Sequence, residues 1–350
     1  MTGTPADEVS GTPSGTPADE ASGAAGGAAG DGAVAVDAYL DCLDRVDADA
    51  ATRLVLGLLD AGWSVADVLV DLVAEAQREI GRRWLTGRWS VAQEHAATHV
   101  SEQVVAAVAR RIPVAGHRGH VVLACVEGEW HALAARIVAE VVRAGGWRVT
   151  FLGASVPPRH LVTYLHQTGP DAVLLSCVQP NRLTRAARMI EMCRSADVPV
   201  VAGGPGFGPD GRWAAAVGAM AWGASARDAV DLLERRFELA SADAPAPPPG
   251  DEHVAVLRRR REVVQAVDLA LAPGEDESEL LAATVAQVLE SLAASIRVGD
   301  PELVAEFVRW QRQTFAARRP LHDALLAACA AALTEHPQAT RYLELARRTD

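Results

Sequence analysis

The chain has 350 residues and a formal net charge of −12 at pH 7, with 49% hydrophobic and 22% charged residues. It is long enough for two or three domains, and most of it can bury a core. The acidic balance argues against a general binder of nucleic acid or anionic membrane, because such binding needs a basic excess. The five cysteines are scattered without a CxxC spacing. This excludes a zinc ribbon or a disulfide scaffold and fits a reducing cytoplasm.

We also expect neither a membrane span nor secretion. No apolar run approaches the roughly 18 residues that a span needs, and the N-terminus lacks a basic start followed by an apolar stretch. The predicted location is therefore the cytoplasm.

Residues 1–32 consist mainly of small and polar residues, and the hexapeptide GTPADE occurs twice among them. Such a segment cannot bury enough apolar surface to offset the entropy cost of ordering. We therefore predict a disordered tail.

Residues 33–113 predict a small helical bundle. Apolar residues recur three and four apart from residue 38 to residue 62, where Gly62 ends the first helical stretch. Ser64 and Ser90 can cap the next two helices, and Pro113 ends the last of them.

Residues 117–241 change to short apolar runs that alternate with segments of helical periodicity. The runs are HVVLACV, WRVTFLG, DAVLLSCV, VPVVAGG and AMAWG. Continuous apolar strands between helices predict a parallel sheet covered on both faces. Five such units make a flavodoxin-like, doubly wound α/β domain, whose ligands bind beyond the carboxyl ends of the strands.

The remainder of the chain predicts a linker and a third domain. Residues 242–250 are a stiff Pro-rich linker, and residues 251–350 have helical periodicity with breaks at APGEDES and VGDPE. The predicted fold class is therefore α/β plus all-α.

The loop after the first predicted strand carries the most informative local signal. A Gly-rich dinucleotide fingerprint is absent there, and His131 instead follows two residues after Glu129. A metal-ligating imidazole usually has its other ring nitrogen held by a carboxylate. The alternative is a solvated loop histidine beside a helix-capping glutamate.

This part of the chain resembles the cobalamin-binding domain family, whose pattern is DxHxxG, then SxL, then GG. The matching stretches are Glu129-x-His131-x-x-Ala134, Ser176-x-Val178 and Gly203-Gly204. Glu for Asp, Ala for Gly and Val for Leu are mild departures. The resemblance implies that His131 is the lower axial ligand of cobalt, and that the displaced nucleotide tail passes the serine and the paired glycines. The cofactor-binding residues expected on this face are Glu129, Trp130, His131, Gly153, Ser176, Val178, Gly203 and Gly204.

The helical bundle adds a second pattern, in which Trp84 precedes Glu94-His95 with nine residues between them. This pattern resembles the bundle of light-dependent cobalamin repressors, which implies that Trp84 covers the adenosyl group and that Glu94 and His95 supply polar contacts. The alternative is a core tryptophan beside a solvated helix face. Where those repressors carry a histidine after the tryptophan, this chain has Leu85, which cannot ligate cobalt. The tail holds no DNA-binding domain, so we expect no nucleic-acid binding.

The third domain resembles that of the photocobilins by domain order alone, and this resemblance implies a noncovalent biliverdin. The residues that could hold its propionates and rings are Trp310, Arg312, Phe315, Arg318 and His322. Cys329 lies in an apolar stretch, which argues against a thioether-linked bilin. The alternative is a basic helix face over an ordinary bundle core.

Together these patterns predict a non-enzymatic light sensor that binds adenosylcobalamin, with His131 on cobalt, and biliverdin. Light would change its conformation or its homo-oligomeric state and thereby its contact with a separate effector protein, without a membrane or nucleic-acid partner. The main alternative is a corrinoid methyl carrier of a methyltransferase system. A mutase subunit would need a substrate barrel of about 250 residues, for which the chain has no room. A helical interaction protein would leave the His131 pattern unexplained.

Overall fold

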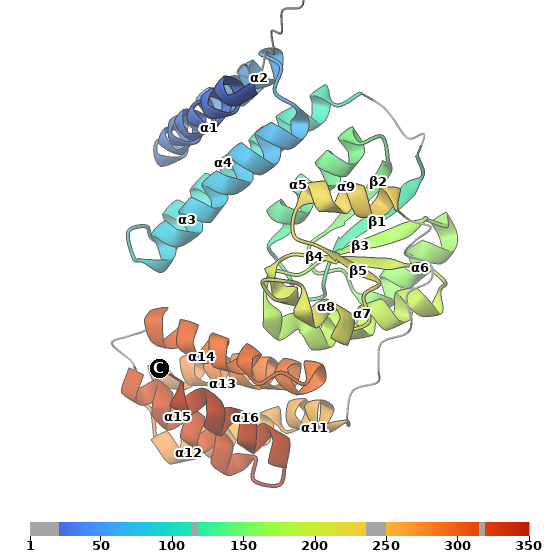
Figure 1. The fold of residues 1–350 in the computed structure, drawn as a ribbon. Coiled ribbons are helices and arrows are strands. Elements are labelled where there is room, and N and C mark those ends of the chain that lie inside the picture. The colour runs from blue at the N-terminus through green and yellow to red at the C-terminus, as the bar shows by residue number, and fades with distance from the viewer. Residues whose placement is uncertain (1–20, 114–117, 236–249, 315–318, 350) are drawn as a thin grey trace, which may run out of the picture.

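The computed structural model describes residues 21–113, 118–235, 250–314 and 319–349. N-terminal helices, a parallel sheet flanked by helices, and C-terminal helices follow one another along the chain (Figure 1). This is the predicted α/β plus all-α class.

The N-terminal part is a helical bundle. Its elements are α1 (Ala21–Asp44), α2 (Ala48–Asp60), the π-helix η1 (Asp67–Ala74), α3 (Glu75–Leu85) and α4 (Val91–Arg111). Asp47 caps α2, and a capping box of Ser90 and Gln93 begins α4. The helices pack around a fully buried apolar core that includes Tyr39 and Leu69.

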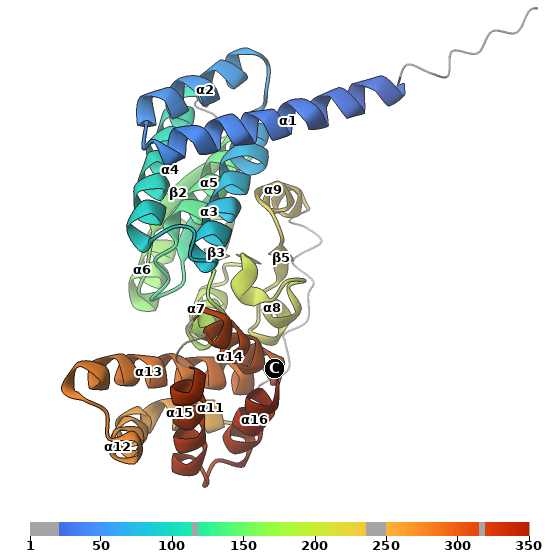
Figure 2. The ribbon, with the colours of Figure 1, turned by 90° about the vertical axis from the view of Figure 1, so that its left-hand side faces the viewer.

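Two predictions about this part are wrong in detail. α1 begins at Ala21, so residues 21–32 are helical, whereas residues 1–20 of the predicted tail lie outside the described residues. Repeated alanines, the best helix formers, extend α1 beyond its packed portion, and Figure 2 shows that end projecting from the bundle. The helical stretch predicted from residue 38 to residue 62 divides at Val46, which adopts a positive φ of 54° just before the Asp47 cap.

The central part is a five-stranded, entirely parallel sheet in the order β2-β1-β3-β4-β5, which confirms the flavodoxin-like topology. The strands are β1 (His120–Cys125), β2 (Arg148–Gly153), β3 (Ala172–Ser176), β4 (Val200–Gly203) and β5 (Ala221–Gly223). The helices are α5 (Ala132–Ala144), α6 (Pro158–Thr168), η2 (Pro180–Arg182), α7 (Leu183–Ser195), η3 (Pro205–Phe207), α8 (Arg212–Ala216) and α9 (Ala226–Glu234). α5 and α9 cover one face of the sheet, and α6, α7 and α8 cover the other (Figure 1).

The carboxyl ends of four strands lie in register. Cys125 pairs with Ser176, Ser176 with Gly203, and Gly203 with Gly223. The sequence therefore places small residues side by side along the edge at which doubly wound sheets bind ligands.

The C-terminal part is all helical. Its helices are α11 (Glu252–Arg258), α12 (Arg260–Leu271), α13 (Glu275–Val298), α14 (Glu302–Thr314), α15 (Arg319–Ala332) and α16 (Pro337–Arg348). Within the described residues, one helical segment, Glu277–Val298 of α13, is apolar and long enough to cross a membrane, but 61% of its apolar window is buried inside the protein. It is a core helix against which the others pack. Most of the predicted linker, residues 242–249, lies outside the described residues.

The two glycines that end β4 allow a test of the fold. Gly204 has a φ of +100°, and a Cβ there would lie 2.4 Å from the carbonyl oxygen of Cys177. We expect Gly204→Ala to lower the free energy of unfolding by about 1–3 kcal/mol, through backbone strain and displacement of the Cys177 loop. Urea unfolding of the cofactor-free chain would measure this.

Gly203→Ala is the matched control. A Cβ at Gly203 meets nothing closer than the Gly223 carbonyl oxygen at 3.6 Å, an ordinary contact. Equal losses of stability in the two variants would contradict the assignment of strain to Gly204.

Candidate functional site

A buried carboxylate and a partly exposed imidazole form the centre of the candidate site. Glu129 is completely buried in the loop between β1 and α5, and His131 is the N-cap residue of α5. One oxygen of Glu129, Oε1, lies 2.5 Å from Nδ1 of His131 and accepts the His131 backbone N–H at 3.0 Å. Its other oxygen, Oε2, accepts the backbone N–H groups of Val178 and Gln179 at 2.8 and 2.9 Å.

These contacts set the ionisation of both groups. Burial alone would raise the pKa of Glu129, but the hydrogen bonds from His131 and from the two amides after β3 outweigh it and lower the pKa to about 2. The hydrogen bond to Glu129 raises the pKa of His131, against the effect of burial. Glu129 is therefore ionised and fixes Nδ1 of His131 as a donor, which leaves Nε2 for an external partner.

A second loop fastens this pair from the β2 side. Ser155 accepts the backbone N–H of Gly128 on its hydroxyl at 3.0 Å and donates its own N–H to the Glu129 carbonyl at 2.9 Å. Its φ of 48° is unusual for a residue other than glycine. The sequence pattern did not indicate Ser155, because no local signal announces such a turn.

The paired glycines lie where the resemblance placed them, at the end of β4 beside Ser176. Glycine is required at position 204 because of its positive φ and the close Cys177 carbonyl oxygen. Gly203 is not, because a side chain there would make only an ordinary contact with the protein. Its glycine therefore leaves space on the outside of the sheet edge, which suits a ligand that approaches the backbone closely.

The other predicted residues of this face have varied surroundings. Gly153 ends β2 with a φ of +82° and open space around its missing Cβ. Val178 acts through its backbone N–H, which holds Glu129, and not through its side chain. Trp130 is 74% exposed, so its ring is available to a ligand or partner.

The bundle residues lie on both sides of the turn between α3 and α4. Trp84 is near the end of α3 and is partly buried, and Glu94 and His95 lie in the first turns of α4. The buried ring of Trp89 fixes this turn beneath the Arg83 guanidinium, at 5.2 Å from the ring centre. His95 is exposed and hydrogen-bonds to Glu94 through Nδ1.

A chain of polar contacts positions Glu94 from within the bundle. Thr98 lies 3.0 Å from Oε1 of Glu94 and 3.2 Å from the Gln77 amide oxygen. Gln77 donates to Ser101 at 2.7 Å, and the buried Tyr39 hydroxyl donates to the same serine at 3.0 Å. Thr98, one turn further along α4, is thus the link between Glu94 and this network, and its single hydroxyl proton serves either Glu94 or Gln77.

The bundle and the sheet converge at His131. The Glu94 carboxylate is near enough to His131 to raise the pKa of that imidazole further, and Arg182 is near enough to lower it. Glu94 of the bundle and His131 of the sheet domain, 37 positions apart in sequence (131 − 94), therefore influence each other electrostatically.

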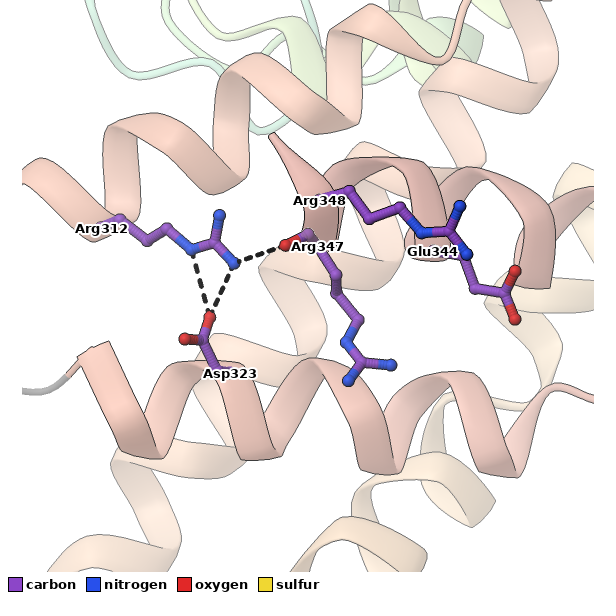
Figure 3. A pocket seen from close by; sticks show the side chains of 5 residues that line it. All are labelled: Arg312, Asp323, Glu344, Arg347 and Arg348. Atoms are coloured by element: carbon purple, nitrogen blue, oxygen red, sulfur yellow. Dashed lines mark hydrogen bonds and ion pairs between the residues drawn. The ribbon is translucent and has the colours of Figure 1, made fainter. Parts of the chain in front are cut away.

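The residues predicted for a bilin lie apart from this site, in the C-terminal helices. Arg312 is buried and donates to Asp323 at 2.7 and 3.1 Å, to the Arg347 carbonyl at 3.1 Å and to the Thr349 carbonyl. It therefore fastens the end of α16 and is not available to a propionate, contrary to its predicted role. Figure 3 shows this arrangement beside a pocket.

The other residues predicted to bind a bilin differ in their contacts. His322 is buried and hydrogen-bonds to Gln311 through Nε2, and its burial lowers its pKa. Trp310 is partly buried and stacks on Phe307, with ring centres 6.0 Å apart. Phe315 and Arg318 lie outside the described residues.

The donor set fits a metal that already has other ligands. No three His, Cys, Asp or Glu side chains of the described segments group into a metal site. A single imidazole backed by a carboxylate can bind a metal ion only when other donors fill the remaining positions, as a corrin ring does for cobalt. The exposed Nε2 of His131 and the space outside Gly203 fit such a group.

Comparison with known proteins agrees with this fit. Residues 119–231 match a family described as a B12 binding domain, and residues 35–109 match a second family of the same description. The fold is similar to that of the monomethylamine corrinoid protein of Methanosarcina barkeri, with a TM-score of 0.51, 17% identity and coverage of 58% of this chain and 99% of that one.

Two kinds of relative share this arrangement. A corrinoid protein of Desulfitobacterium hafniense is 23% identical over 54% of this chain and 91% of its own length. The HTH-type transcriptional repressor CarA of Myxococcus xanthus is 31% identical over 49% of this chain, which spans only 58% of that repressor.

The matched segments thus define a B12-binding module within residues 35–231, in which a helical bundle precedes a doubly wound domain. Both segments support the binding of a corrinoid by this part of the chain.

The buried carboxylate predicts how the cofactor-free chain responds to acid. Because the pKa of Glu129 falls from 4.5 to about 2 on folding, its stabilisation is complete above pH 4.5 and is lost as the pH falls towards 2. Glu129→Gln should remove up to about 3 kcal/mol of stability at pH 7 and flatten its decline between pH 4.5 and pH 2.5. Urea unfolding at several pH values would measure both effects.

Glu127→Gln is the matched control, because the Glu127 side chain makes no hydrogen bond to any described residue. An unchanged acid profile in Glu129→Gln, relative to this control, would contradict the ionised state of Glu129.

Proposed function

We propose that the chain is a light sensor that binds adenosylcobalamin through His131, with the bundle as a cover over the opposite side of the cofactor. The observation that carries this proposal is the packing of the bundle on α5, the helix that begins at the His131 cap: Leu133, Ile137 and Val141 of α5 belong to the apolar core of the bundle. Glu94 of the bundle is also near enough to raise the pKa of His131. The similarity to CarA, which is named a transcriptional repressor, also favours a regulatory role.

The residues divide the work of binding. Glu129 holds Nδ1 of His131, so Nε2 would be the atom left to hold cobalt, and the space at Gly203 would admit the nucleotide tail. Trp84 supplies a flat apolar face for the adenosyl group, and Glu94 and His95 supply hydrogen bonds. When bound, adenosylcobalamin would supply a cobalt–carbon bond that visible light breaks. Loss of the adenosyl group would leave Trp84 without its partner and release the bundle, changing conformation or oligomeric state.

The turn after Trp84 limits how the illuminated state can form. Leu85 is 40% exposed and has no donor atom for a metal. The alternatives are water and the two histidines His95 and His99, which are both exposed on α4.

The alternative is a corrinoid methyl carrier of a methyltransferase system. It is favoured by the corrinoid proteins that this chain matches over nearly their whole length, such as the trimethylamine corrinoid protein of Methanosarcina mazei, at 24% identity over 94% of that protein. A carrier needs to open its bundle to expose a methyl group and needs no adenosyl cover.

An experiment with Trp84→Ala separates the two functions. If Trp84 stacks on the adenosyl group, its loss should weaken binding of adenosylcobalamin by about tenfold and leave binding of methylcobalamin unchanged. Absorption titration in the dark measures both affinities. Green light should then bleach the wild-type adenosylcobalamin complex and change its elution volume in size-exclusion chromatography.

His131→Ala is the reference variant, because it removes the imidazole proposed to ligate cobalt and should lose the histidine-ligated spectrum. It also removes a donor to the buried Glu129 carboxylate, so circular dichroism first checks that the variant is folded. Equal weakening for both cobalamins in Trp84→Ala, or no change of elution after photolysis in the wild type, would favour the carrier.

A second ligand, biliverdin, forms a further part of the proposal for the C-terminal helices. A pocket of about 430 Å³ is lined by Arg312, Asp323, Glu344, Arg347 and Arg348. Arg312 is already bound to Asp323, but Arg347 and Arg348 form no ion pair with any described residue (Figure 3). Two exposed guanidinium groups at one pocket are suited to a ligand with two carboxylates.

Absorption spectra after addition of biliverdin test this pocket. Arg347→Ala with Arg348→Ala should weaken a far-red band of bound biliverdin by at least about tenfold in affinity, because two charge-assisted hydrogen bonds are lost. Arg341→Ala, an exposed arginine on the same helix, is the control. A band of equal strength in all three proteins would place the bilin elsewhere, and no band in the wild type would remove it from the proposal.

A further inference from the structure

Two arginines, Arg182 and Arg185, pack against the loop that leads to His131. A guanidinium nitrogen of Arg185 is so close to Gly128 that a Cβ there would lie 2.2 Å from it, and the Arg182 guanidinium carbon would lie at 3.6 Å. Arg185 also donates to the Glu127 carbonyl at 3.4 Å. The two side chains therefore support the backbone that leads into Glu129.

The same arginines follow the loop after β3, whose amides bind Glu129. Arg182 is the last residue of η2, three positions after the Gln179 amide that binds the carboxylate, and Arg185 lies in the first turn of α7. The pair thus contacts both loops whose backbone fixes the Glu129–His131 unit.

A carboxylate from the C-terminal helices holds this arginine pair. Glu290, on α13, accepts from Arg182 at 2.8 Å through one oxygen and from Arg185 at 2.9 Å through the other. The Glu290 and Arg182 side chains are only 15% and 18% exposed, so solvent screens this pair weakly, whereas Arg185 is 36% exposed. Removal of Glu290 leaves two guanidinium groups facing each other.

The C-terminal helices also contact the sheet domain at a second place, further from His131. The buried indole of Trp213 donates to Asp300 at 2.8 Å, and Arg297 donates to the Ala216 carbonyl at 3.1 Å. Leu303 packs into the core beneath the sheet. This second contact can keep the helices docked when the Glu290 contact is lost.

We propose that Glu290 is a positioning residue of the cobalamin site, through which the C-terminal helical domain supports the His131 loop. The docking of these helices and the binding of the cofactor are thereby thermodynamically coupled. By thermodynamic reciprocity, cofactor binding then stabilises the docked state of α13, and docking strengthens cofactor binding. The C-terminal helices would thus be the element that senses the state of the cobalt site. The inference builds on the proposed cobalamin site, but it requires no photochemistry.

The test compares Glu290→Gln with Glu279→Gln in the full chain and in the dark. Glu279 lies on the same helix, is exposed and forms no ion pair with any described residue, so its variant changes charge alone. Glu290→Gln should weaken hydroxocobalamin binding by about tenfold relative to the control. It should also speed hydrogen exchange of residues 127–131 about tenfold in the cofactor-free protein, with circular dichroism as the check of folding.

A variant that lacks both arginines, Arg182→Ala with Arg185→Ala, provides the second comparison. If Glu290 acts through the two guanidinium groups, adding Glu290→Gln to that variant should weaken cobalamin binding no further. Affinity and loop exchange of Glu290→Gln within twofold of Glu279→Gln would overturn the inference.

The outcomes remain distinct from those of the proposed function. A wild-type protein that binds cobalamin in the dark but ignores light would refute the sensor and leave the Glu290 comparison intact. A wild-type protein that binds no cobalamin would refute both the site and the assignment of Glu290 to it, while the exchange rates would still show whether Glu290 orders the loop.

Discussion

Burial of the Glu129 carboxylate is the constraint on which the candidate site depends. An ionised carboxylate without partners would cost several kcal/mol inside the protein, so the fold must bring N–H donors to it. Those donors come from His131 and from the two residues after β3. They can meet because β1 and β3 are adjacent parallel strands, so the loops that follow them lie side by side at the same edge of the sheet. The topology of the sheet and the tautomer of His131 are therefore two consequences of one arrangement.

The parts of this site that the sequence predicts are those with a local signal. Alternating apolar runs and helical segments predict the order of the strands along the chain, and a carboxylate two residues before a histidine predicts the Glu129–His131 contact. The supporting groups carry no such signal. The Gln179 amide acts through its backbone, and Ser155 contributes through an unusual φ. Glu290 meets Arg185 across 105 positions of sequence, where only the docked fold can show the pair.

The arginines show most clearly that the sequence alone does not separate a structural side chain from one that is free to bind a ligand. Arg312 and Arg347 are similar in sequence, since each lies in the last turn of a helix with aromatic or acidic neighbours. In the structure Arg312 is buried and bound to Asp323 and to two carbonyl groups, whereas Arg347 is exposed at the edge of a pocket. A guanidinium has five donors, and only the surrounding acceptors decide whether they fasten a helix end or remain for a ligand.

Three parts of the chain act on one imidazole. The sheet domain fixes Nδ1 of His131 through Glu129, the Glu94 carboxylate of the bundle helps to raise the pKa of the imidazole, and the C-terminal helices support its loop through Glu290 and two arginines. The matched B12-binding segment ends at residue 231, whereas Glu290 belongs to the helices that follow. A carrier that must expose cobalt to other proteins gains little from an additional domain fastened to the loop beneath it. A sensor gains an element whose docking free energy depends on what His131 binds, because a change at the imidazole then alters contacts on two opposite sides of the sheet edge at once.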